Sequence, residues 1–279
     1  MAGIKKYIKR FFEQLQLNGV LKNMHFNGVK AWYYFSNQSF KKANPLIAIP
    51  DSTYLFETYQ LNYKQYFEQG KLAAKEICLW TEPYLQMEVP TILDWGCGTG
   101  RVIQHVHTYA PYALLYGADS NAEMIQWNSK NLSGIHFTGI QPTTPTTYPS
   151  KYFNLVFGIS VFTHLSKSAS IEWIIELHRI IQTDGILLVT THGSYFMPQL
   201  FVTEKKQLLE SGYFSKPFSV NKNIDGNRND TSYHTQAYFE ELVSDYFKLV
   251  SFYDGNKHPE KMGGQDLWIL QKKEAISKI

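Results

Sequence analysis

The feature that most constrains the fold is a glycine-rich turn that directly follows an apolar run, TILDWGCGTGR at residues 91–101. The run TIL predicts a buried strand, and three glycines come after it at alternate positions. Glycine lets the backbone adopt torsions that other residues disfavour, and it lets the backbone approach a ligand without an intervening Cβ. We therefore expect a sharp turn into a helix that starts near residues 99–101, with a ligand bound against the turn.

The spacing of these glycines distinguishes between candidate ligands. Dinucleotide-binding turns have the pattern G-x-G-x-x-G, and phosphate-binding loops have G-x-x-x-x-G-K-S/T. Here the pattern is D-x-G-x-G-x-G, with Arg101 next and no Lys-Ser/Thr pair. The carboxylate of Asp94 would repel a diphosphate but would suit the ammonium group of an amino acid. The turn thus favours a ligand with an amino-acid moiety.

Short apolar runs alternate with helical segments along most of the chain. Such alternation predicts a parallel sheet covered by helices on both faces. The clearest helical patterns lie at 59–80 and 171–181, and two late runs, 247–253 and 266–272, predict a final strand pair. Prolines predict an extended connector at 44–52 and a surface loop at 142–150. The remaining predicted strands are 91–95, 113–118, 135–137, 153–157 and 186–191.

Composition describes a globular chain. With 279 residues, of which 44% are hydrophobic, it can bury one substantial core and a smaller appendage. No apolar run approaches the ~20 residues that cross a bilayer, and the start lacks the features of a secretory signal, so we expect a cytoplasmic protein. The two cysteines, Cys78 and Cys97, fit a reducing compartment. Cys97 lies in the glycine turn, where a small filler side chain is favoured over a reactive thiol.

The N-terminal segment is strongly basic. Residues 1–42 contain eight Lys and Arg and a single acid, Glu13, whereas the whole chain has a net charge of only +3. Apolar residues recur at helical spacing in 4–17, which predicts a basic amphipathic helix. Such a helix can bind an anionic membrane surface, follow a phosphate backbone, or pack its apolar stripe onto the body as a cap. We favour the cap.

Several segments in order resemble the class I S-adenosylmethionine (SAM)-dependent methyltransferases, whose first motif is an acid followed by G-x-G-x-G. Segment 113–125 places Asp119 at the end of the second strand, and segments 150–166 and 176–193 resemble the family's fourth and fifth strands. The resemblance covers roughly residues 60–275. It implies a doubly wound, mostly parallel seven-stranded α/β sheet with helices on both faces, here with a helical N-terminal cap and an insertion after the fifth strand.

The resemblance also implies SAM as cofactor and a set of residues that bind it. In the family, the acid at the position of Asp119 holds both ribose hydroxyls. Ile140 stands where the family often has an acid for the adenine amino group, which leaves that contact to Gln141 or to backbone carbonyls. Asn154 and Asp184 also depart from the family pattern, and we expect both to be structural. The expected cofactor-binding residues are Asp94, Gly96, Cys97, Gly98, Thr99, Gly100, Asp119, Ser120, Ile140, Gln141 and Ser160.

Histidines supply the candidate catalytic groups. His164 and His192 both follow the carboxyl ends of predicted strands, where open α/β sheets bind their ligands. Because histidine suits proton transfer near neutral pH, each is a candidate general base, and the alternative is a hydrogen-bonded wall residue. His105 and His107 form an H-x-H pair, but side chains two apart on a helix point to different sides, so we expect no metal site.

The domain organisation suggests how an acceptor is enclosed. We expect a basic arm or cap at 1–58 and a methyltransferase domain at 59–279, in which 192–234 form a substrate lid. Aromatic residues of 195–218 and 32–35 would then surround a small acceptor and exclude water. The alternative for each aromatic residue is ordinary core packing.

Three functions compete. The first is methylation of a small or sugar-like acceptor at oxygen, with a base that removes the hydroxyl proton. The second is methylation of a nucleic acid or protein. The body's net negative charge and the absence of an N/D-P-P-Y/F motif disfavour a nucleic-acid substrate. The third is cofactor binding without catalysis, which the complete glycine motif disfavours. The acceptor and the oligomeric state are left open.

Overall fold

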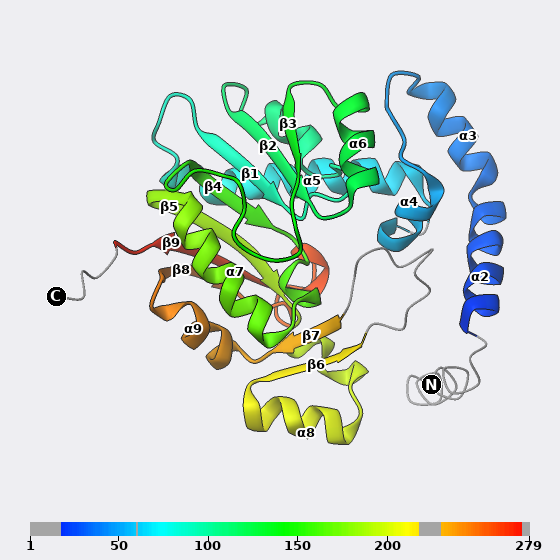
Figure 1. Cartoon of the computed structure of the whole chain (residues 1–279). Helices are drawn as coiled ribbons and strands as arrows, with labels where there is room; N and C mark the ends of the chain where they lie inside the picture. The colour runs from blue at the N-terminus through cyan, green and yellow to red at the C-terminus, as the bar shows by residue number, and fades with distance from the viewer. Residues whose placement is uncertain (1–17, 60, 218–229, 275–279) are drawn as a thin grey trace. The chain divides into compact units, whose positions relative to one another are not determined.

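The computed structural model describes residues 18–59, 61–217 and 230–274 (Figure 1). The predicted basic helix at 4–17 lies outside these residues. The described residues divide into two compact units, one within residues 18–70 and the other of residues 71–217 with 230–274. Because the second unit contains the glycine turn, it is the unit that carries the candidate site.

A mostly parallel seven-stranded sheet forms the centre of the second unit, in the order β3-β2-β1-β4-β5-β9-β8. The first five strands in this order run parallel, whereas β9 is antiparallel to β5 and β8 is antiparallel to β9. This arrangement confirms the predicted fold class and the closing strand pair. The strands are β1 (Thr91–Trp95), β2 (Leu114–Asp119), β3 (Ile135–Gly139), β4 (Phe153–Gly158), β5 (Ile181–Thr191), β8 (Phe247–Tyr253) and β9 (Asp266–Lys272).

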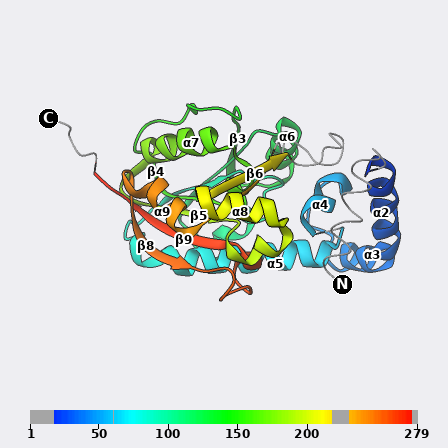
Figure 2. The same cartoon turned by 90° about the horizontal axis from the view of Figure 1, so that it is seen from below.

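Helices cover both faces of this sheet, as Figure 2 shows for α5 and α7. On one face, the second half of α5 (Tyr63–Thr81) and the 3-10 helix η2 (Ile103–Thr108) pack into an apolar cluster with β1, β2, β4, β5 and β9. On the other face, α7 (Lys167–Ile180) and α9 (Gln236–Ser244) form a second cluster. The helix α6 (Ala122–Asn131) packs against β2 and β3. Short 3-10 helices also occur at η1 (Glu82–Tyr84) and η5 (Met262–Gly264).

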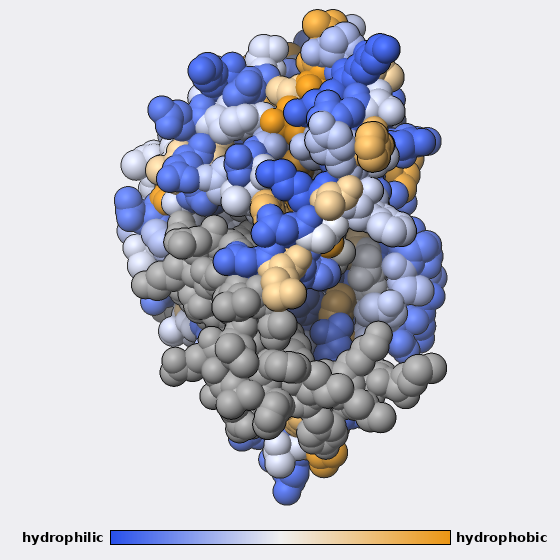
Figure 3. Space-filling view, turned by 90° about the vertical axis from the view of Figure 1, so that its right-hand side faces the viewer, coloured by the Kyte–Doolittle hydropathy of each residue, from blue (hydrophilic) through white to orange (hydrophobic). Residues whose placement is uncertain are grey.

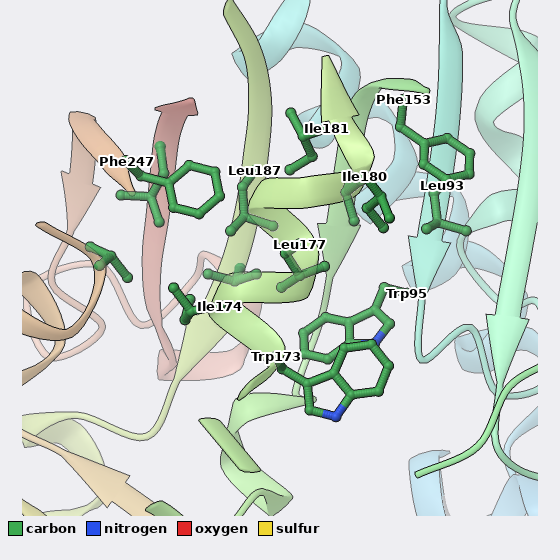
Figure 4. Close-up of a cluster of buried hydrophobic side chains, with 14 of the residues drawn as sticks. Leu93, Trp95, Phe153, Trp173, Ile174, Leu177, Ile180, Ile181, Leu187 and Phe247 are labelled. Atoms are coloured by element: carbon green, nitrogen blue, oxygen red, sulfur yellow. The ribbon is translucent and has the colours of Figure 1, made fainter. Parts of the chain in front are cut away.

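The α7 face of the sheet has an aromatic centre (Figure 4). The ring centroids of Trp95 and Trp173 lie 4.9 Å apart, and Phe162 packs edge-on against Trp95 at 5.4 Å. The helix α7 begins where the Ser166 hydroxyl accepts a hydrogen bond from the Ala169 amide at 3.2 Å, so it starts earlier than its apolar pattern at 171–181 predicts. This packing fixes α7 behind the loop that follows β4.

Two local predictions are corrected. The helix expected from residues 99–101 is instead η2, whose tight turns are closed by bonds such as His105 N–H to Val102 O at 3.0 Å. Its buried β-branched residues have low helix propensity, which disfavours a longer α-helix. Strand β5 begins at Ile181 rather than at residue 186, because Ile181 already pairs with Phe153 ahead of a register shift. Asp184 lies in that irregular stretch, with a left-handed φ of 59°.

The insertion after β5 is a small folded element. It consists of η4 (Ser194–Gln199), α8 (Val202–Ser211) and the antiparallel strands β6 (Tyr213–Pro217) and β7 (Asp230–His234). Its own apolar cluster contains Leu200, Leu208 and Tyr233, with Phe196, Met197 and Phe214 packed against it. The insertion is therefore more than a surface loop, and its last strand leads directly into α9.

The first unit is helical. It contains α2 (Asn18–Trp32), α3 (Tyr34–Ala43), α4 (Ser52–Tyr59) and the start of α5, around a cluster of Leu55, Leu61 and Tyr66. The buried Asn37 side chain donates to Leu61 O at 2.7 Å and accepts from the Tyr63 amide at 3.1 Å. These two bonds connect α3 to the entry of α5.

The helices α2 and α3 expose apolar side chains. Trp32 and Phe35 are 81% and 80% exposed, and Tyr34 is also exposed. Figure 3, which looks onto the side of these helices, shows apolar patches scattered among hydrophilic residues. These aromatic side chains are thus not core residues of the first unit. Among the described residues, no helix has the length and apolar character needed to span a bilayer.

We expect Leu177→Ala to lower the free energy of unfolding by about 2–5 kcal/mol, because Leu177 is completely buried between α7 and the sheet. Urea denaturation followed by circular dichroism measures this change. The matched control is Ile175→Ala on the same helix, where a 47% exposed side chain should cost no more than about 0.5 kcal/mol. Equal losses in the two variants would contradict the described orientation of α7.

Candidate functional site

The glycine turn after β1 leaves room for a ligand at its middle residue. Gly98 has a left-handed φ of 51°, and a Cβ built on it would meet nothing closer than the Met124 sulfur at 3.9 Å. In contrast, a Cβ on Gly96 would run into Val161, and one on Gly100 would run into Leu132. Gly96 and Gly100 are therefore needed for close packing inside the protein, whereas a Cβ at Gly98 would make only an ordinary van der Waals contact with Met124. The sequence predicts that the amino-acid moiety of the ligand lies against this residue.

Asp119, at the end of β2, is bound to the same turn. One oxygen of its carboxylate accepts a hydrogen bond from the Gly98 amide at 2.8 Å, and the other accepts one from the Asn121 amide at 2.8 Å. Two backbone donors thus fix the orientation of a partly exposed carboxylate. The Asn121 side chain in turn caps α6 by accepting from the amides of Glu123 and Met124. The charge of Asp119 is accordingly held at a defined place beside the glycine turn.

Asp94 lies beneath the turn. It is only 3% exposed, and burial raises the pKa of its carboxyl to about 8, against the opposing effect of nearby Arg101 and with a further increase from Asp119. The backbone amide of Ile103 donates a hydrogen bond to it. Asp94 thus connects the end of β1 to the start of η2.

The side chains of Cys97 and Thr99 are buried in the turn, and each residue is 7% exposed. Burial raises the pKa of the Cys97 thiol well above its ordinary value, so the thiol stays protonated. Next to it, the Asn128 side chain on α6 donates to Gly98 O at 2.8 Å and thereby ties the turn to α6. Cys97 therefore acts as a filler side chain, as the sequence favours, and not as a reactive thiol.

The remaining cofactor candidates follow neighbouring strands. Ser120 comes after β2, Ile140 and Gln141 come after β3, and Ser160 comes after β4. The Ile140 amide donates to Asp119 O at 3.0 Å, which joins two of these loops. Because β3, β2, β1 and β4 are adjacent and parallel, all the predicted cofactor residues lie at or near the carboxyl ends of these strands, which form one edge of the sheet.

Ser160 is held by residues that the sequence analysis missed. Its backbone is left-handed, with a φ of 62°, and its amide donates to the Thr190 hydroxyl at 2.8 Å. Gln265 donates to the Ser160 hydroxyl and accepts from the Thr190 hydroxyl, both at 2.6 Å. Such a strained residue persists only when its surroundings fix it. The signal that identifies Gln265 is its position just before β9, since an antiparallel strand starts at the edge where parallel strands end.

The structure places both candidate bases against the strand β7. His164 ends the short helix η3 (Phe162–His164), and its Nδ1 lies 2.9 Å from Asp230 O. His192 follows β5, and its Nδ1 lies 3.2 Å from Ser232 O. Burial lowers the pKa of His192 to about 4, although the bond to Ser232 opposes this effect. Both imidazoles are thus held at the same edge as the cofactor candidates.

A third histidine, His234 on β7, was not singled out by the sequence analysis. It is 1% exposed, and neither of its ring nitrogens has a hydrogen-bond partner within the described residues. Its ring packs against Tyr213 and Phe239 at 5.3 and 5.5 Å. Burial, together with the nearby His192, lowers its pKa to about 3. No apolar-periodicity or motif signal marks a histidine of this kind.

The other histidine pair lies on η2. His105 is buried in η2, and His107 is partly exposed on the same helix. In the described parts of the chain, no three His, Cys, Asp or Glu side chains are grouped so that they could hold a metal ion.

The second unit has the fold of the class I SAM-dependent methyltransferases, and the comparisons below support a methyltransferase that uses SAM as its cofactor. Residues 92–185 match the family model described as a methyltransferase domain. This match spans the segment from β1 to the start of β5, and so includes every predicted cofactor residue.

Solved structures show the same fold. A SAM-dependent methyltransferase from Methanosarcina mazei is 16% identical, with a TM-score of 0.53 over 70% of this chain and 97% of that one. A protein from Pyrococcus horikoshii is 17% identical, with a TM-score of 0.55 over 81% and 100%. A chain from the complex of the Haloferax volcanii Trm112 methyltransferase activator with a methyltransferase is 12% identical, with a TM-score of 0.53 over 81% and 100%. No curated protein matches the sequence significantly.

We expect Asp119→Ala to raise the dissociation constant for SAM about 100-fold or more, because two charged hydrogen bonds to ribose hydroxyls would be lost. Isothermal titration calorimetry with SAM and with its demethylated product measures this change. The control is Asp245→Ala, since Asp245 precedes β8 at the opposite edge of the sheet and should leave affinity unchanged. Unaltered affinity in Asp119→Ala would show that this carboxylate does not bind the cofactor.

We also expect His192 and His234 to contribute a loss of stability in mild acid. They have folded-state pKa values of about 4 and about 3, whereas an unfolded histidine titrates near 6.5. At these two positions the unfolded chain therefore binds more protons below about pH 6.5, which lowers the free energy of unfolding as the pH falls from there toward about 4. Asp94 and Asp266 have the opposite effect, because burial raises the pKa of each carboxyl in the folded state, to about 8 and about 6.

His234→Phe tests this dependence, because an apolar ring removes the titration without leaving a hydrogen-bond partner unsatisfied. Urea denaturation at about pH 7 and about pH 5 should show that the stability of this variant, relative to the parent, is greater at the lower pH. His258→Gln, at an exposed position, should follow the same pH dependence as the parent. The same pH dependence in His234→Phe as in the parent would refute the assignment.

Proposed function

We propose that the enzyme methylates an oxygen atom of a small or sugar-like acceptor, and that a histidine removes the proton of the acceptor's hydroxyl. The observation that carries this proposal is the pair His164 and His192, each held through Nδ1 by a backbone carbonyl at the edge that presents the glycine turn. A carbonyl oxygen only accepts hydrogen bonds, so each Nδ1 carries the proton. The lone pair of each neutral ring is then on Nε2, where it can accept a proton.

Bound SAM would supply a methyl group on a positively charged sulfur. One imidazole Nε2 would take the hydroxyl proton while the new oxygen–carbon bond forms, which leaves a methyl ether and an imidazolium. The positive charge lost at sulfur thus reappears on the histidine, so charge is balanced. The protein contributes by holding the acceptor in line and by accepting the proton.

Of the two histidines, His164 is the stronger candidate for the base. It lies in the loop that follows Ser160, close along the chain to a proposed cofactor residue. The low pKa of His192 keeps that ring neutral at physiological pH but makes it a weak proton acceptor. We therefore assign proton removal to His164 and orientation of the acceptor hydroxyl to His192.

The neighbouring side chains support a small acceptor. The ring of His192 lies 4.3 Å from that of Phe196 and 5.4 Å from that of Tyr233. Both rings belong to the apolar cluster of the insertion. Aromatic walls with a few convergent polar groups are typical of sites for small molecules. They also suit the predicted role of the insertion as a lid over the acceptor.

The cofactor contacts are proposed on the same basis. Gly98 would admit the amino-acid moiety, Asp119 would bind the ribose hydroxyls, and Ser160 would lie near the reacting end. Ile140 and Gln141 follow β3 and would flank the adenine, with Ile140 partly buried and Gln141 exposed. Asp94 is buried, so it would support the cofactor indirectly, by holding the glycine turn in place.

Methyl-labelled SAM tests the acceptor directly. Incubation with a metabolite extract, followed by mass spectrometry, should give a labelled small-molecule methyl ether. Label found in protein or nucleic acid would overturn the proposed acceptor class. Label on nitrogen or carbon would overturn only the choice of oxygen.

We expect His164→Ala to lower turnover about 10²- to 10⁴-fold, while the dissociation constant for SAM stays nearly unchanged. His192→Ala is the parallel variant, and a loss confined to it would transfer the role of base to His192. Steady-state kinetics with the identified acceptor, together with calorimetry, measures both effects. Normal turnover in both variants would mean that positioning alone accounts for catalysis.

A further inference from the structure

The strand β7 has two hydrogen-bonding edges with different partners. One edge pairs with β6, in a register that includes Phe214 opposite Tyr233. Alternate residues of β7 bond on the other side: Asp230 O and Ser232 O accept from the two histidine rings, and the His234 amide donates to His192 O at 2.9 Å. The pair of strands β6 and β7 thus lies beside the candidate site and is hydrogen-bonded to both candidate bases.

Two hydroxyl groups fasten this pair of strands to the loop after β4. The Ser232 hydroxyl donates to Leu165 O at 2.5 Å, and the Tyr213 hydroxyl donates to the same oxygen at 3.0 Å. The two hydroxyls lie 3.2 Å from each other. Ser232 is completely buried, whereas Tyr213 and Leu165 are partly exposed. We call these two hydrogen bonds to Leu165 O the clasp. Because Leu165 directly follows His164, the clasp is one residue away from a proposed base.

From this geometry we infer that Tyr213 and Ser232 are positioning residues: by clasping Leu165 O they dock β7 so that its carbonyls hold the Nδ1–H tautomer of His164 and His192. The inference deepens the proposed function, on which its catalytic meaning rests. Neither hydroxyl needs to touch the cofactor or the acceptor. Their effect on catalysis passes through the ring nitrogens that β7 holds.

The tautomer matters because a neutral imidazole accepts a proton at only one nitrogen. A histidine free in water favours the Nε2–H form, whose lone pair is on Nδ1. In this structure Nδ1 faces a carbonyl, so the Nε2–H form would set two acceptors against each other. Docking of β7 therefore selects the form in which Nε2 accepts the proton. If the clasp is removed, both rings should revert toward the solution mixture.

Nitrogen NMR of the full chain, with ¹⁵N-labelled histidine and saturating SAM, reads these tautomers without an acceptor. The signals are assigned with His164→Gln and His192→Gln. In the parent, both rings should show a protonated Nδ1 and an unprotonated Nε2. In Tyr213→Phe/Ser232→Ala, both should shift toward a mixture with protonated Nε2. Ser232→Thr, which keeps the hydroxyl, should restore the parent signals when Tyr213 is intact.

Two controls separate positioning from general damage. Ser215→Ala removes a hydroxyl from β6 opposite Ser232 and should leave the histidine signals unchanged, because Ser215 makes no side-chain hydrogen bond within the described residues. The affinity for SAM should be unchanged in every variant, which shows that the sheet is folded. The single variant Tyr213→Phe retains the Ser232 bond and gives a milder case if the double variant is unstable.

Protonated Nε2 in the parent rings, or parent signals retained in the double variant, would overturn the inference. Its failure is distinguishable from failure of the proposed function. If the parent shows the described tautomers but His164→Ala and His192→Ala turn over normally, the histidines are not catalytic bases. The clasp would then still set their tautomers. Once an acceptor is known, the double variant should lower kcat at least about tenfold with an unchanged affinity for SAM.

Discussion

The site depends on one constraint, the reversal of strand order between β1 and β4. From β1 the chain adds β2 and then β3 on one side, and it returns to place β4 on the other side. Open α/β sheets bind ligands at such a point, because the loops from the two strands leave in opposite directions. The Asp119 bond to Gly98 joins the loops on one side of β1, and close packing of Gly96 on Val161 joins those on the other.

Much of this fold could be predicted from sequence because buried strands are short, largely apolar runs bounded by polar turns. The runs that begin at Thr91 and Asp266 matched their strands from end to end. Predictions failed where hydrogen bonding, rather than burial, decides the structure. Segment 103–108 is a 3-10 helix, and Ile181 pairs with Phe153 ahead of a register shift. Neither feature produces a regular spacing of apolar residues in the sequence.

The proposed cofactor residues could be named from the sequence because they follow successive strands and include a compact motif. The groups that hold Ser160 and the candidate bases could not. Gln265, Tyr213 and Ser232 act through hydrogen bonds to residues 48 to 105 positions away. Ordinary polar residues at such separations give no local signal. His164 and His192 could be proposed from their strand ends, but the nitrogen that each presents is set by β7, which only the folded chain reveals.

The antiparallel direction of β9 has a consequence for how the protein is made. Its first residues reach the cofactor edge only because the strand runs against its neighbours, and Gln265 then completes the support of Ser160. A ribosome releases residues 92–185 long before it releases Gln265. The nascent chain holds the entire glycine turn while the loop after β4 still lacks its final brace. During synthesis, the loop after β4 therefore gains its bond to Gln265 only when almost all of the sheet has emerged.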